Sequence, residues 1–257
     1  DPKKIYTIVK TKSYLIKGAN FLWECDKSLI KDIKIPNKES FCFPNGIKDY
    51  LLDIANNKKK LIDKNFYDEI INQELSIRLE IAISFNEDEN GKIYTFCNSI
   101  NTNLGGTHES AIKSAIIKSI KLYSRHNKIP KIANINLSDI FDYSDTILSL
   151  YVSNPIFEGQ TKQKLFMPKI HANLEKIIIE SFSHWLSTNN RQTKKLIEVL
   201  IERSLLRSNL TKIKDLERKT TIEKHRLPGK LVDCSSRKIQ GTELFIVEGD
   251  SAGGSAK

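Results

Sequence analysis

Apolar and polar side chains alternate along residues 76–85. The apolar members of this alternation are Ile77, Leu79, Ile81 and Ile83. A period of two residues is typical of a strand that buries one face. The dipeptide Asn90-Gly91 follows, which favours a tight turn, and an apolar segment returns at residues 92–100. The pattern therefore predicts a β-hairpin formed by these two segments.

Helical periodicity marks three later segments. The apolar side chains that recur three or four positions apart after residue 107 are Ile112, Ile116, Ile120 and Tyr123, and they are expected to face a sheet. Thr107 is predicted to cap this helix, and Glu109 lies in its first turn, where the helix dipole favours a carboxylate. Two long amphipathic helices are predicted after it, at residues 168–186 and from residue 191 into a basic stretch.

The remaining elements give a mixed architecture. They are a helix at 5–15, a strand at 14–26 entered through Gly18, a turn at 44–55 and a strand at 145–157. A polar, lysine-rich stretch at 56–65 is the first candidate domain boundary. A sheet covered by helices on one side, which the chain leaves through a long helix, belongs to the α/β or α+β class.

Length and composition fit a water-soluble globular protein. With 257 residues and 39% hydrophobic content, the chain can bury a core of one large or two modest domains. No apolar run approaches the roughly 18 residues that a membrane helix needs. The chain begins at Asp1 and its single methionine is Met167, so we expect a piece of a longer protein. The four cysteines are scattered, which favours reduced thiols in a cytoplasmic protein over a zinc site.

The net charge of +10 is concentrated in one stretch. Residues 203–238 hold 11 Lys and Arg against 4 Asp and Glu, so 11 − 4 = +7 lies within them. Such a cluster is typical of a surface that faces nucleic acid, where released counterions supply affinity. A solvated basic helix accounts for the charge equally well, so both interpretations stay open.

Residues 242–257 read TELFIVEGDSAGGSAK. Ser251 stands in a string like a serine protease loop, but the inserted Ala252 and the mixed fold argue against that class. The glycines lack the G-K-[ST] ending of a phosphate loop. The run LFIV predicts a parallel strand buried on both faces, with Glu248 at its carboxyl end, where ligands gather in open sheets. One carboxylate is half of a Mg²⁺ site, and an acidic surface turn is the alternative.

Four strings in this sequence resemble signatures of one family, the B subunits of bacterial type IIA DNA topoisomerases (gyrase and topoisomerase IV). LPGKLVDC at 227–234 and the stretch 242–257 resemble the start of their Toprim domain. INTNLGGTHESAIKSAI at 100–116 and NPIFEGQTKQKL at 154–165 resemble their transducer region. FCFPNGIKDYL, SHWL and TELFIVEGD look more like topoisomerase IV than gyrase.

The resemblance implies three domains. Residues 1–55 would be the C-terminal remnant of a GHKL-type ATPase domain. Residues 56–208 would be the transducer, with a left-handed βαβ, ribosomal-protein-like fold and long helices. Residues 209–257 would be a basic connector and the first strand of a truncated Toprim domain.

The resemblance also implies site residues. Gln160 and Lys162 match the loop that reaches from the transducer into the ATP pocket and touches the γ-phosphate. A lysine suits that role, because a compact ammonium neutralises terminal phosphate charge. Glu248 matches the Toprim glutamate that binds Mg²⁺ and acts as general acid or base on the 3′ oxygen of DNA, with an Asp-x-Asp pair expected beyond Lys257. The turn 105–107 is interpreted as structural.

The function implied is that of a topoisomerase IV B subunit, which couples ATP binding and hydrolysis to DNA strand passage, decatenation and relaxation. Its cofactors would be Mg²⁺ and ATP. Its partners would be duplex DNA, the A subunit that carries the DNA-attacking tyrosine, and a second B subunit in an A2B2 assembly of the bacterial cytoplasm and nucleoid. A gyrase B subunit is the alternative. Taken by itself, the chain is expected to be catalytically inactive, as a DNA-binding or structural coupling module.

Overall fold

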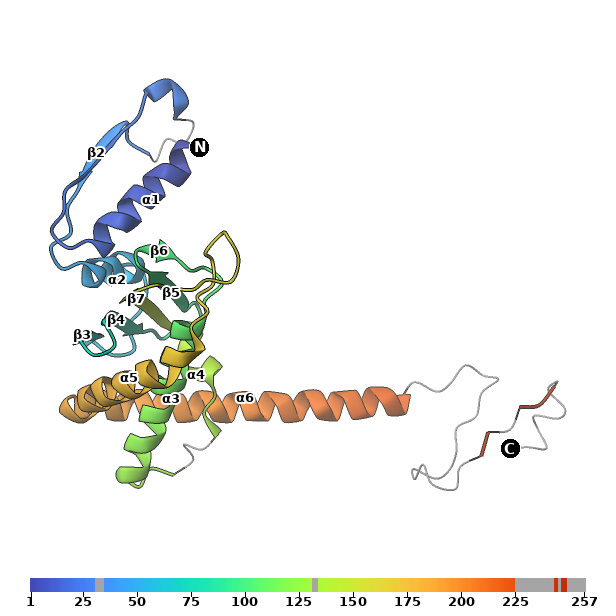
Figure 1. Cartoon of the computed structure of the whole chain (residues 1–257). Coiled ribbons are helices and arrows are strands. Elements are labelled where there is room, and N and C mark those ends of the chain that lie inside the picture. The colour runs from blue at the N-terminus through green and yellow to red at the C-terminus, as the bar shows by residue number, and fades with distance from the viewer. Residues whose placement is uncertain (31–34, 131–133, 225–242, 245, 249–257) are drawn as a thin grey trace. The chain divides into compact units, whose positions relative to one another are not determined.

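Two compact units, Asp1–Leu205 and Leu206–Lys257, divide the chain in the computed structural model (Figure 1). The structure describes residues 1–30, 35–130, 134–224, 243, 244 and 246–248. The helices are α1 (Pro2–Leu15), the 3-10 helix η1 (Lys27–Leu29), α2 (Ile47–Ala55), α3 (Thr107–His126), α4 (Leu137–Phe141), α5 (Pro168–Thr188) and α6 (Asn190–Lys224). The strands are β1 (Phe21–Glu24), β2 (Lys38–Phe41), β3 (Phe66–Asn72), β4 (Ile77–Phe85), β5 (Lys92–Cys97), β6 (Ile100–Asn101) and β7 (Ser144–Val152). Among the described residues no helix is both long enough and apolar enough to span a membrane.

A five-stranded mixed sheet with strand order β3-β4-β7-β5-β6 is the centre of the first unit. β4 pairs antiparallel with β3 and with β7, whereas β5 pairs parallel with β7. The predicted hairpin of β4 and β5 is therefore wrong, because β7 lies between them. The turn at Asn90-Gly91 does reverse the chain, but it passes the start of β7, where the amide of Gly91 donates to the carbonyl of Asp142 at 2.7 Å.

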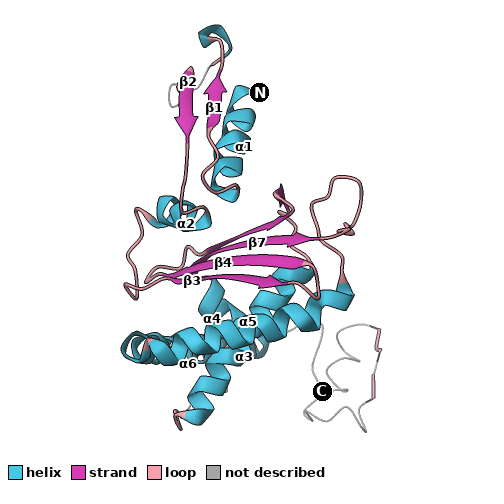
Figure 2. Cartoon of the chain, turned by 60° about the vertical axis from the view of Figure 1, so that its left-hand side comes forward, coloured by secondary structure: helices cyan, strands magenta, loops and turns pink. Residues whose placement is uncertain are grey.

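Helices cover both faces of this sheet, and Figure 2 shows α3, α5 and α6 on one side and α2 on the other. The larger core joins Leu79 and Ile81 to apolar side chains of α3, α5 and α6. A second core on the opposite face joins Ala82 to Ile47 and Leu51 of α2. The expectations of helices on one side only and of a half-buried strand at 77–85 are therefore corrected.

The segment predicted as a turn at 44–55 is a turn followed by α2. Gly46 (φ +61°) ends the turn and precedes the helix, which places Ile47 and Leu51 on the sheet. Sequence reading missed the helix because it is only nine residues long and follows a strong Pro-Asn-Gly turn signal. The helices predicted at 5–15, 168–186 and from 191 are confirmed as α1, α5 and α6.

The lysine-rich stretch 56–65 packs on the sheet rather than forming an exposed linker. Leu61 and Ile62 are buried in the larger core. Lys58 pairs with the fully buried Asp145 of β7 at 2.7 Å. Residues 1–55 belong to the same compact unit as the sheet, and the three-domain scheme stays a prediction.

The predicted buried strand near the C-terminus does not form in the described residues. Leu244 and Ile246 are 87% and 88% exposed, and residues 243, 244 and 246–248 belong to no strand. The physical reason is that a parallel strand needs a neighbouring strand to pair its backbone and helices to cover its faces, and the described residues of the second unit include no strand that could pair with this segment. The string at 227–234, Ser251 and the glycines after Glu248 lie outside the described residues.

Candidate functional site

The stretch between β7 and α5 folds into a hairpin, and Gln160 and Lys162 lie at its tip. Its two limbs are joined by the amide of Glu158 donating to the carbonyl of Lys164 at 2.9 Å. At the tip the chain turns through two residues with positive φ, Gly159 at +81° and Lys162 at +56°. The amide of Lys162 donates to the carbonyl of Gly159 at 3.4 Å, which closes the turn. Residues 154–166 are hereafter called the tip hairpin.

The glycine pair before α3 holds the base of the tip hairpin. The amide of Leu165 donates to the carbonyl of Gly105 at 3.1 Å, and the carbonyl of Leu165 accepts from the amide of Thr107 at 3.0 Å. A Cβ on Gly106 would lie 2.2 Å from the Leu165 oxygen, so no other residue fits this approach. Two sequence motifs about fifty residues apart thus meet at one β-like contact, which gives the predicted turn at Gly105 and Gly106 a structural role.

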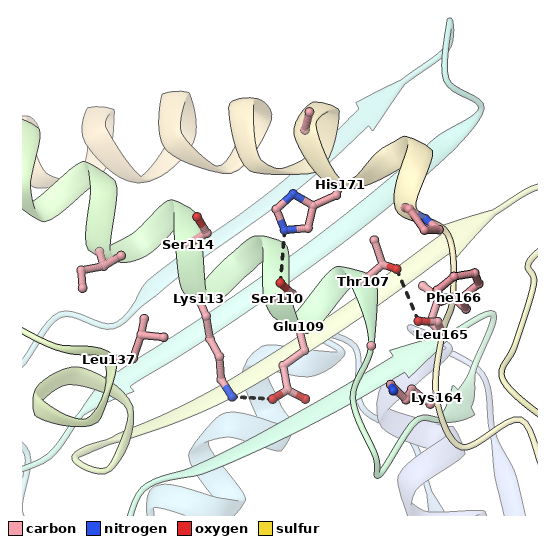
Figure 3. A pocket seen from close by; sticks show the side chains of 14 residues that line it. Thr107, Glu109, Ser110, Lys113, Ser114, Leu137, Lys164, Leu165, Phe166 and His171 are labelled. Carbon is pink, nitrogen blue, oxygen red and sulfur yellow. Dashed lines mark hydrogen bonds and ion pairs between the residues drawn. The ribbon is translucent and has the colours of Figure 1, made fainter.

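Thr107 has a different role from the predicted one. Gly106 is the N-cap residue and Thr107 is the first residue of α3. The Thr107 hydroxyl donates to the carbonyl of Leu165 at 3.4 Å (Figure 3). It also accepts from the amide of Met167 at 2.9 Å. A hydroxyl expected to cap its own helix instead ties that helix to the segment entering α5.

The exposed tip carries a cation without a fixed partner. Lys164, on the second limb, is paired with Glu158 at 2.6 Å. Lys162 forms no ion pair with any described carboxylate, and it and Gln160 are exposed. An ammonium and an amide two residues apart on a firmly held turn can donate to anionic oxygens, of which a terminal phosphate offers several.

A hollow of about 1060 Å³ lies beside the base of the tip hairpin, between α3 and α5 (Figure 3). Of the two lysines on its wall, Lys113 is paired with Glu109 at 2.6 Å and Lys164 with Glu158 at 2.6 Å. The hydroxyl of Ser110 lies 3.2 Å from Nε2 of His171. Within the described residues no carboxylate is hydrogen-bonded to this imidazole, so the pair lacks the third group of a nucleophilic triad.

His108, next to Thr107, supports the same turn from inside. Its Nε2 lies 3.0 Å from the hydroxyl of Thr102, which donates to the carbonyl of Thr95 at 2.9 Å. Burial lowers the pKa of His108 to about 4. The imidazole is therefore neutral near pH 7 and serves the fold.

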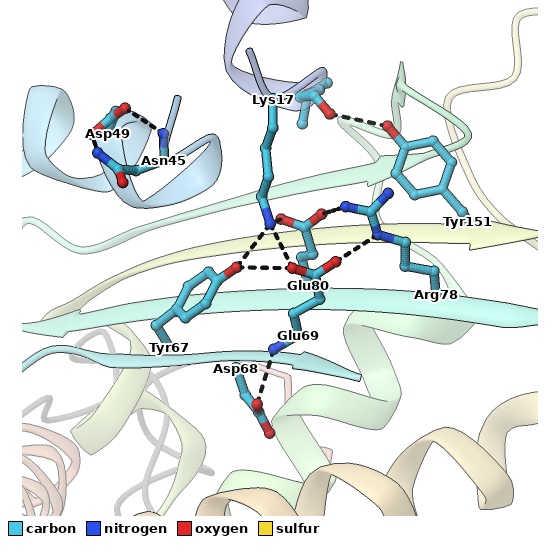
Figure 4. Close-up of polar contacts among 10 residues, drawn as sticks. Lys17, Asn45, Asp49, Tyr67, Asp68, Glu69, Arg78, Glu80 and Tyr151 are labelled. Atoms are coloured by element: carbon cyan, nitrogen blue, oxygen red, sulfur yellow. Dashed lines mark hydrogen bonds and ion pairs between the residues drawn. The ribbon is translucent and has the colours of Figure 1, made fainter. Parts of the chain in front are cut away.

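A charged cluster joins the end of α1 to the sheet (Figure 4). The ammonium of Lys17 lies 2.6 Å from Glu69 and 3.1 Å from the buried Glu80, and Arg78 contacts both carboxylates at 2.8 Å. Burial acts to lower the pKa of Lys17, but its hydrogen bonds with Glu69, Tyr67 and Glu80 outweigh that effect and raise it. The same lysine holds the pKa of Glu69 below its usual range.

Arg203 anchors α6 to the segments that flank the central strands of the sheet. Its guanidinium donates to the carbonyl of Asn86 at 2.9 Å and lies 3.6 Å from the centre of the Tyr143 ring. Burial lowers the pKa of this guanidinium. The anchor therefore joins α6 to the β4–β5 connection and to the start of β7.

Sequence reading missed both Lys17 and Arg203, although each left a signal. A glutamate inside an apolar strand, as at Glu80, needs a cationic partner when both faces are buried. Arg203 follows the buried Leu196 and Leu200 by seven and three residues, which places it on the same helix face. In the sequence, Arg203 is the first residue of the basic stretch 203–238, so its charge does not stand out as that of a buried side chain.

The described residues do not assemble a metal site. They contain no group of three or more His, Cys, Asp or Glu side chains placed to hold an ion. Glu248 is exposed and lies in the second unit, while Gln160 and Lys162 lie together in the first. Gln160 and Lys162 are thus carried by one turn of the first unit, and Glu248 belongs to the second unit.

The chain matches known proteins along its length. The family model for DNA gyrase B matches residues 46–216. The B subunit of DNA topoisomerase 4 from Rickettsia typhi is 42% identical over 100% of this chain, which spans 39% of that protein. The B subunit of DNA gyrase from Bacillus mycoides is 37% identical over 86% of this chain and 55% of its own length.

Solved structures share the fold. The 43K ATPase domain of Thermus thermophilus gyrase B, solved in complex with an aminocoumarin, superposes with a TM-score of 0.69 at 24% identity, over 84% of this chain and 56% of that one. The topoisomerase IV ATP-binding domain of Francisella tularensis, in complex with a small-molecule inhibitor, gives 0.64 at 22% identity, over 80% and 53%.

Proposed function

The chain belongs to the DNA gyrase B family of bacterial type IIA topoisomerase B subunits, and from that premise we propose that it couples nucleotide state to DNA strand passage. It spans about two fifths of the length of its topoisomerase 4 relatives, 39% in the Rickettsia typhi case, so the activity proposed is that of the whole subunit. That activity is ATP-driven decatenation and relaxation of DNA together with an A subunit. Negative supercoiling, as in gyrase, is the alternative.

The tip hairpin is the observation that carries this proposal. Its exposed Gln160 and Lys162 project from a base clamped to the start of α3 through Leu165. The hairpin continues directly into α5, and α6 begins two residues after α5 ends. A contact at the tip can therefore shift α3 and α5 together and, through them, α6.

The residues present fit contact with the terminal phosphate of ATP. Lys162 would donate to its oxygens as a point charge and Gln160 would orient it through its amide. When bound, ATP supplies the phosphoryl group whose loss removes the partner of the lysine. The tip is then free to move, which makes the hairpin a two-state element biased by nucleotide.

Glu248 is proposed as one carboxylate ligand of Mg²⁺ near the cleaved DNA strand. The described residues alone do not fit a complete magnesium site, because Mg²⁺ sites usually add a second carboxylate, phosphate oxygens and waters. No step of the coupling mechanism depends on this ion. Duplex DNA, an A subunit and a second B subunit are the partners proposed for the whole protein.

The decisive test is Lys162→Ala in the complete B subunit assembled with its A subunit. We expect ATP-driven decatenation of linked DNA circles to fall by about 100-fold or more, because a charge-assisted contact to the phosphate is lost. ATP-independent DNA cleavage should stay within about twofold of wild type, because no cleavage chemistry uses this residue.

Lys164→Ala is the matched control. It removes an equal charge two residues away that is already paired with Glu158, and it should leave decatenation within about twofold. Wild-type decatenation in Lys162→Ala, or an equal loss in both variants, would refute the proposed sensor.

A second candidate function is DNA binding through the basic stretch on and after α6. Without the buried Arg203, residues 204–238 hold 10 Lys and Arg against 4 Asp and Glu, so 10 − 4 = +6 favours this candidate. It predicts that the isolated chain binds duplex DNA without nucleotide. The logarithm of the affinity should fall with the logarithm of salt concentration with a slope of about −0.9 per phosphate contacted. Absence of binding at low salt would remove this candidate.

A further inference from the structure

A cavity of about 410 Å³ lies next to the tip hairpin, between α1 and the β5–β6 turn. Polar side chains on its wall include Thr7, Thr11, Lys12, Asn101, Asn103 and Thr161. It differs from the hollow in Figure 3, which lies at the base of the same hairpin between α3 and α5. Neither Gln160 nor Lys162 is among the described residues that line the smaller cavity.

Lys12 is the chemical centre of this cavity. Its ammonium donates to the main-chain carbonyl of Ser99, and among the described residues no carboxylate forms an ion pair with it. Burial lowers the pKa of Lys12, so its charge is held partly out of water at a cost. One neutral carbonyl accepts from an ammonium that has three donors, which leaves two for another acceptor.

The β5–β6 turn fixes the acceptor that aims Lys12. Asn98 and Ser99 have φ values of +48° and +60°, a pair of left-handed residues typical of a tight turn. The Asn98 side chain secures this turn, since its oxygen accepts from the amide of Val152 at 2.9 Å and its nitrogen donates to the Val152 carbonyl at 3.0 Å. The ammonium is therefore positioned by a rigid main chain.

The rest of the wall completes the chemistry of a ligand site. None of the described residues that line the cavity is acidic, and several carry hydroxyl or amide donors. Ile8, Phe96 and Ile100 supply an apolar wall. One cation, neutral donors and an apolar wall suit a ligand with one anionic head and a compact apolar body. A carboxylate matches an ammonium in size and charge.

We propose that this cavity binds a small organic monocarboxylate, with its head on Lys12 and its body against Ile8, Phe96 and Ile100. Thr161 lies on the wall between Gln160 and Lys162 in sequence, so an occupant would hold the tip hairpin against α1. That restraint on the tip rests on the proposed nucleotide-sensing role. Binding itself does not.

The test uses the whole chain and three small molecules that separate the contribution of the anionic head from that of the apolar body. Benzoate carries both, benzyl alcohol has the body without the charge, and acetate has the charge without the body. We expect benzoate to shift the amide NMR signals of Lys12, Ser99 and Thr161 saturably. Benzyl alcohol and acetate should each bind about tenfold more weakly, because each lacks one of the two contacts.

Two variants locate the site. Lys12→Gln should weaken benzoate binding about tenfold, since a charged hydrogen bond becomes a neutral one. Lys4→Gln removes an exposed lysine of the same helix outside the cavity and should leave the affinity within about twofold. Thr161→Val, at an exposed position where folding is not at risk, should weaken binding about threefold by removing a donor.

Three results would overturn the proposal. They are no saturable benzoate shift, equal affinity for benzoate and benzyl alcohol, or equal loss in Lys12→Gln and Lys4→Gln. Lys162→Ala separates this inference from the proposed function, because Lys162 does not line the cavity and its loss should leave benzoate affinity unchanged. The Lys162→Ala variant thus tests nucleotide sensing, and the Lys12→Gln variant tests ligand binding.

Discussion

At the scale of single residues, His108 links the fold to pH. Its imidazole is fully buried and its pKa lies at about 4 instead of the usual 6.5, because burial penalises the charged form. Above pH 6.5 the side chain is neutral in both the folded and the unfolded chain, so it adds no pH dependence. Below pH 6.5 the unfolded chain takes up the proton first, which favours unfolding.

We therefore expect His108 to reduce the free energy of unfolding as pH falls from 6.5 toward 4. The loss should reach about 3 kcal/mol at pH 4, at roughly 1.4 kcal/mol per pKa unit. Urea denaturation of wild type and His108→Gln at a series of pH values measures it. The stability gap between the two proteins should shrink by that amount, and parallel pH curves would show that His108 does not titrate this way.

The site residues show where prediction from sequence ends at this scale. Gln160 and Lys162 could be named only through the family resemblance, because a lysine in a polar loop carries no signal of its own. What no pattern could show is that Leu165 ties their hairpin to Gly105 and Gly106. That contact joins segments far apart in sequence, and only the folded sheet brings them together.

At the scale of elements, apolar patterning located most helices and strands but not their neighbours. The alternation in β4 predicted a strand correctly and its environment wrongly, because Glu80 and Ser84 are buried under the opposite layer. The strong turn at Asn90-Gly91 predicted pairing of β4 with β5. Pairing depends on which strand fills the space between them, and β7, about fifty residues later, fills it.

The anchor of α6 gives a prediction at the same scale. Arg203→Lys keeps the charge but loses the planar group that reaches the carbonyl of Asn86 and stacks on Tyr143. We expect the free energy of unfolding to fall by about 2 kcal/mol, from one charged hydrogen bond and one cation–π contact. Amide hydrogen exchange in α6 near residue 203 should accelerate in parallel.

Arg191→Lys is the control for that prediction. Arg191 is exposed near the start of the same helix, so its replacement should change stability by less than about 0.5 kcal/mol. If the two variants are equally stable, the buried guanidinium does not hold the helix.

At the scale of the whole molecule, Lys17 connects residues 1–55 to the sheet. Its side chain passes Gly46 so closely that a Cβ there would lie 2.6 Å from it, and it ends between Glu69 and Glu80. The contacts of Lys17 with the two glutamates are drawn in Figure 4. If the tip hairpin responds to nucleotide, we expect these contacts to make the N-terminal segment and the sheet move as one body.

Lys17→Met should therefore loosen the N-terminal segment more than the sheet. In the variant, Arg78 would be the one cation of the cluster left beside the buried Glu80. Because the Lys17 side chain is about a quarter exposed, water screens part of the lost attraction, and we expect the free energy of unfolding to fall by about 1–2 kcal/mol. Hydrogen exchange should rise in α1 and α2 before it rises in β4. Uniform exchange across the unit would contradict a local connection.

Lys38→Met is the matched control for that comparison. Lys38 pairs with Glu24 at 3.3 Å, and both side chains are more than half exposed. Its loss should change stability by less than about 0.5 kcal/mol.

The position of β7 in the middle of the sheet also governs the order in which the chain can assemble. While the ribosome has released only residues up to about 140, β3 and β4 can form their hairpin, but β4 and β5 each have an open side with no partner. Those unpaired edges can attract strands of other nascent chains until residue 152 has emerged and the central strand inserts. Nascent chains stalled just before β7 should therefore aggregate more readily than chains stalled just after it.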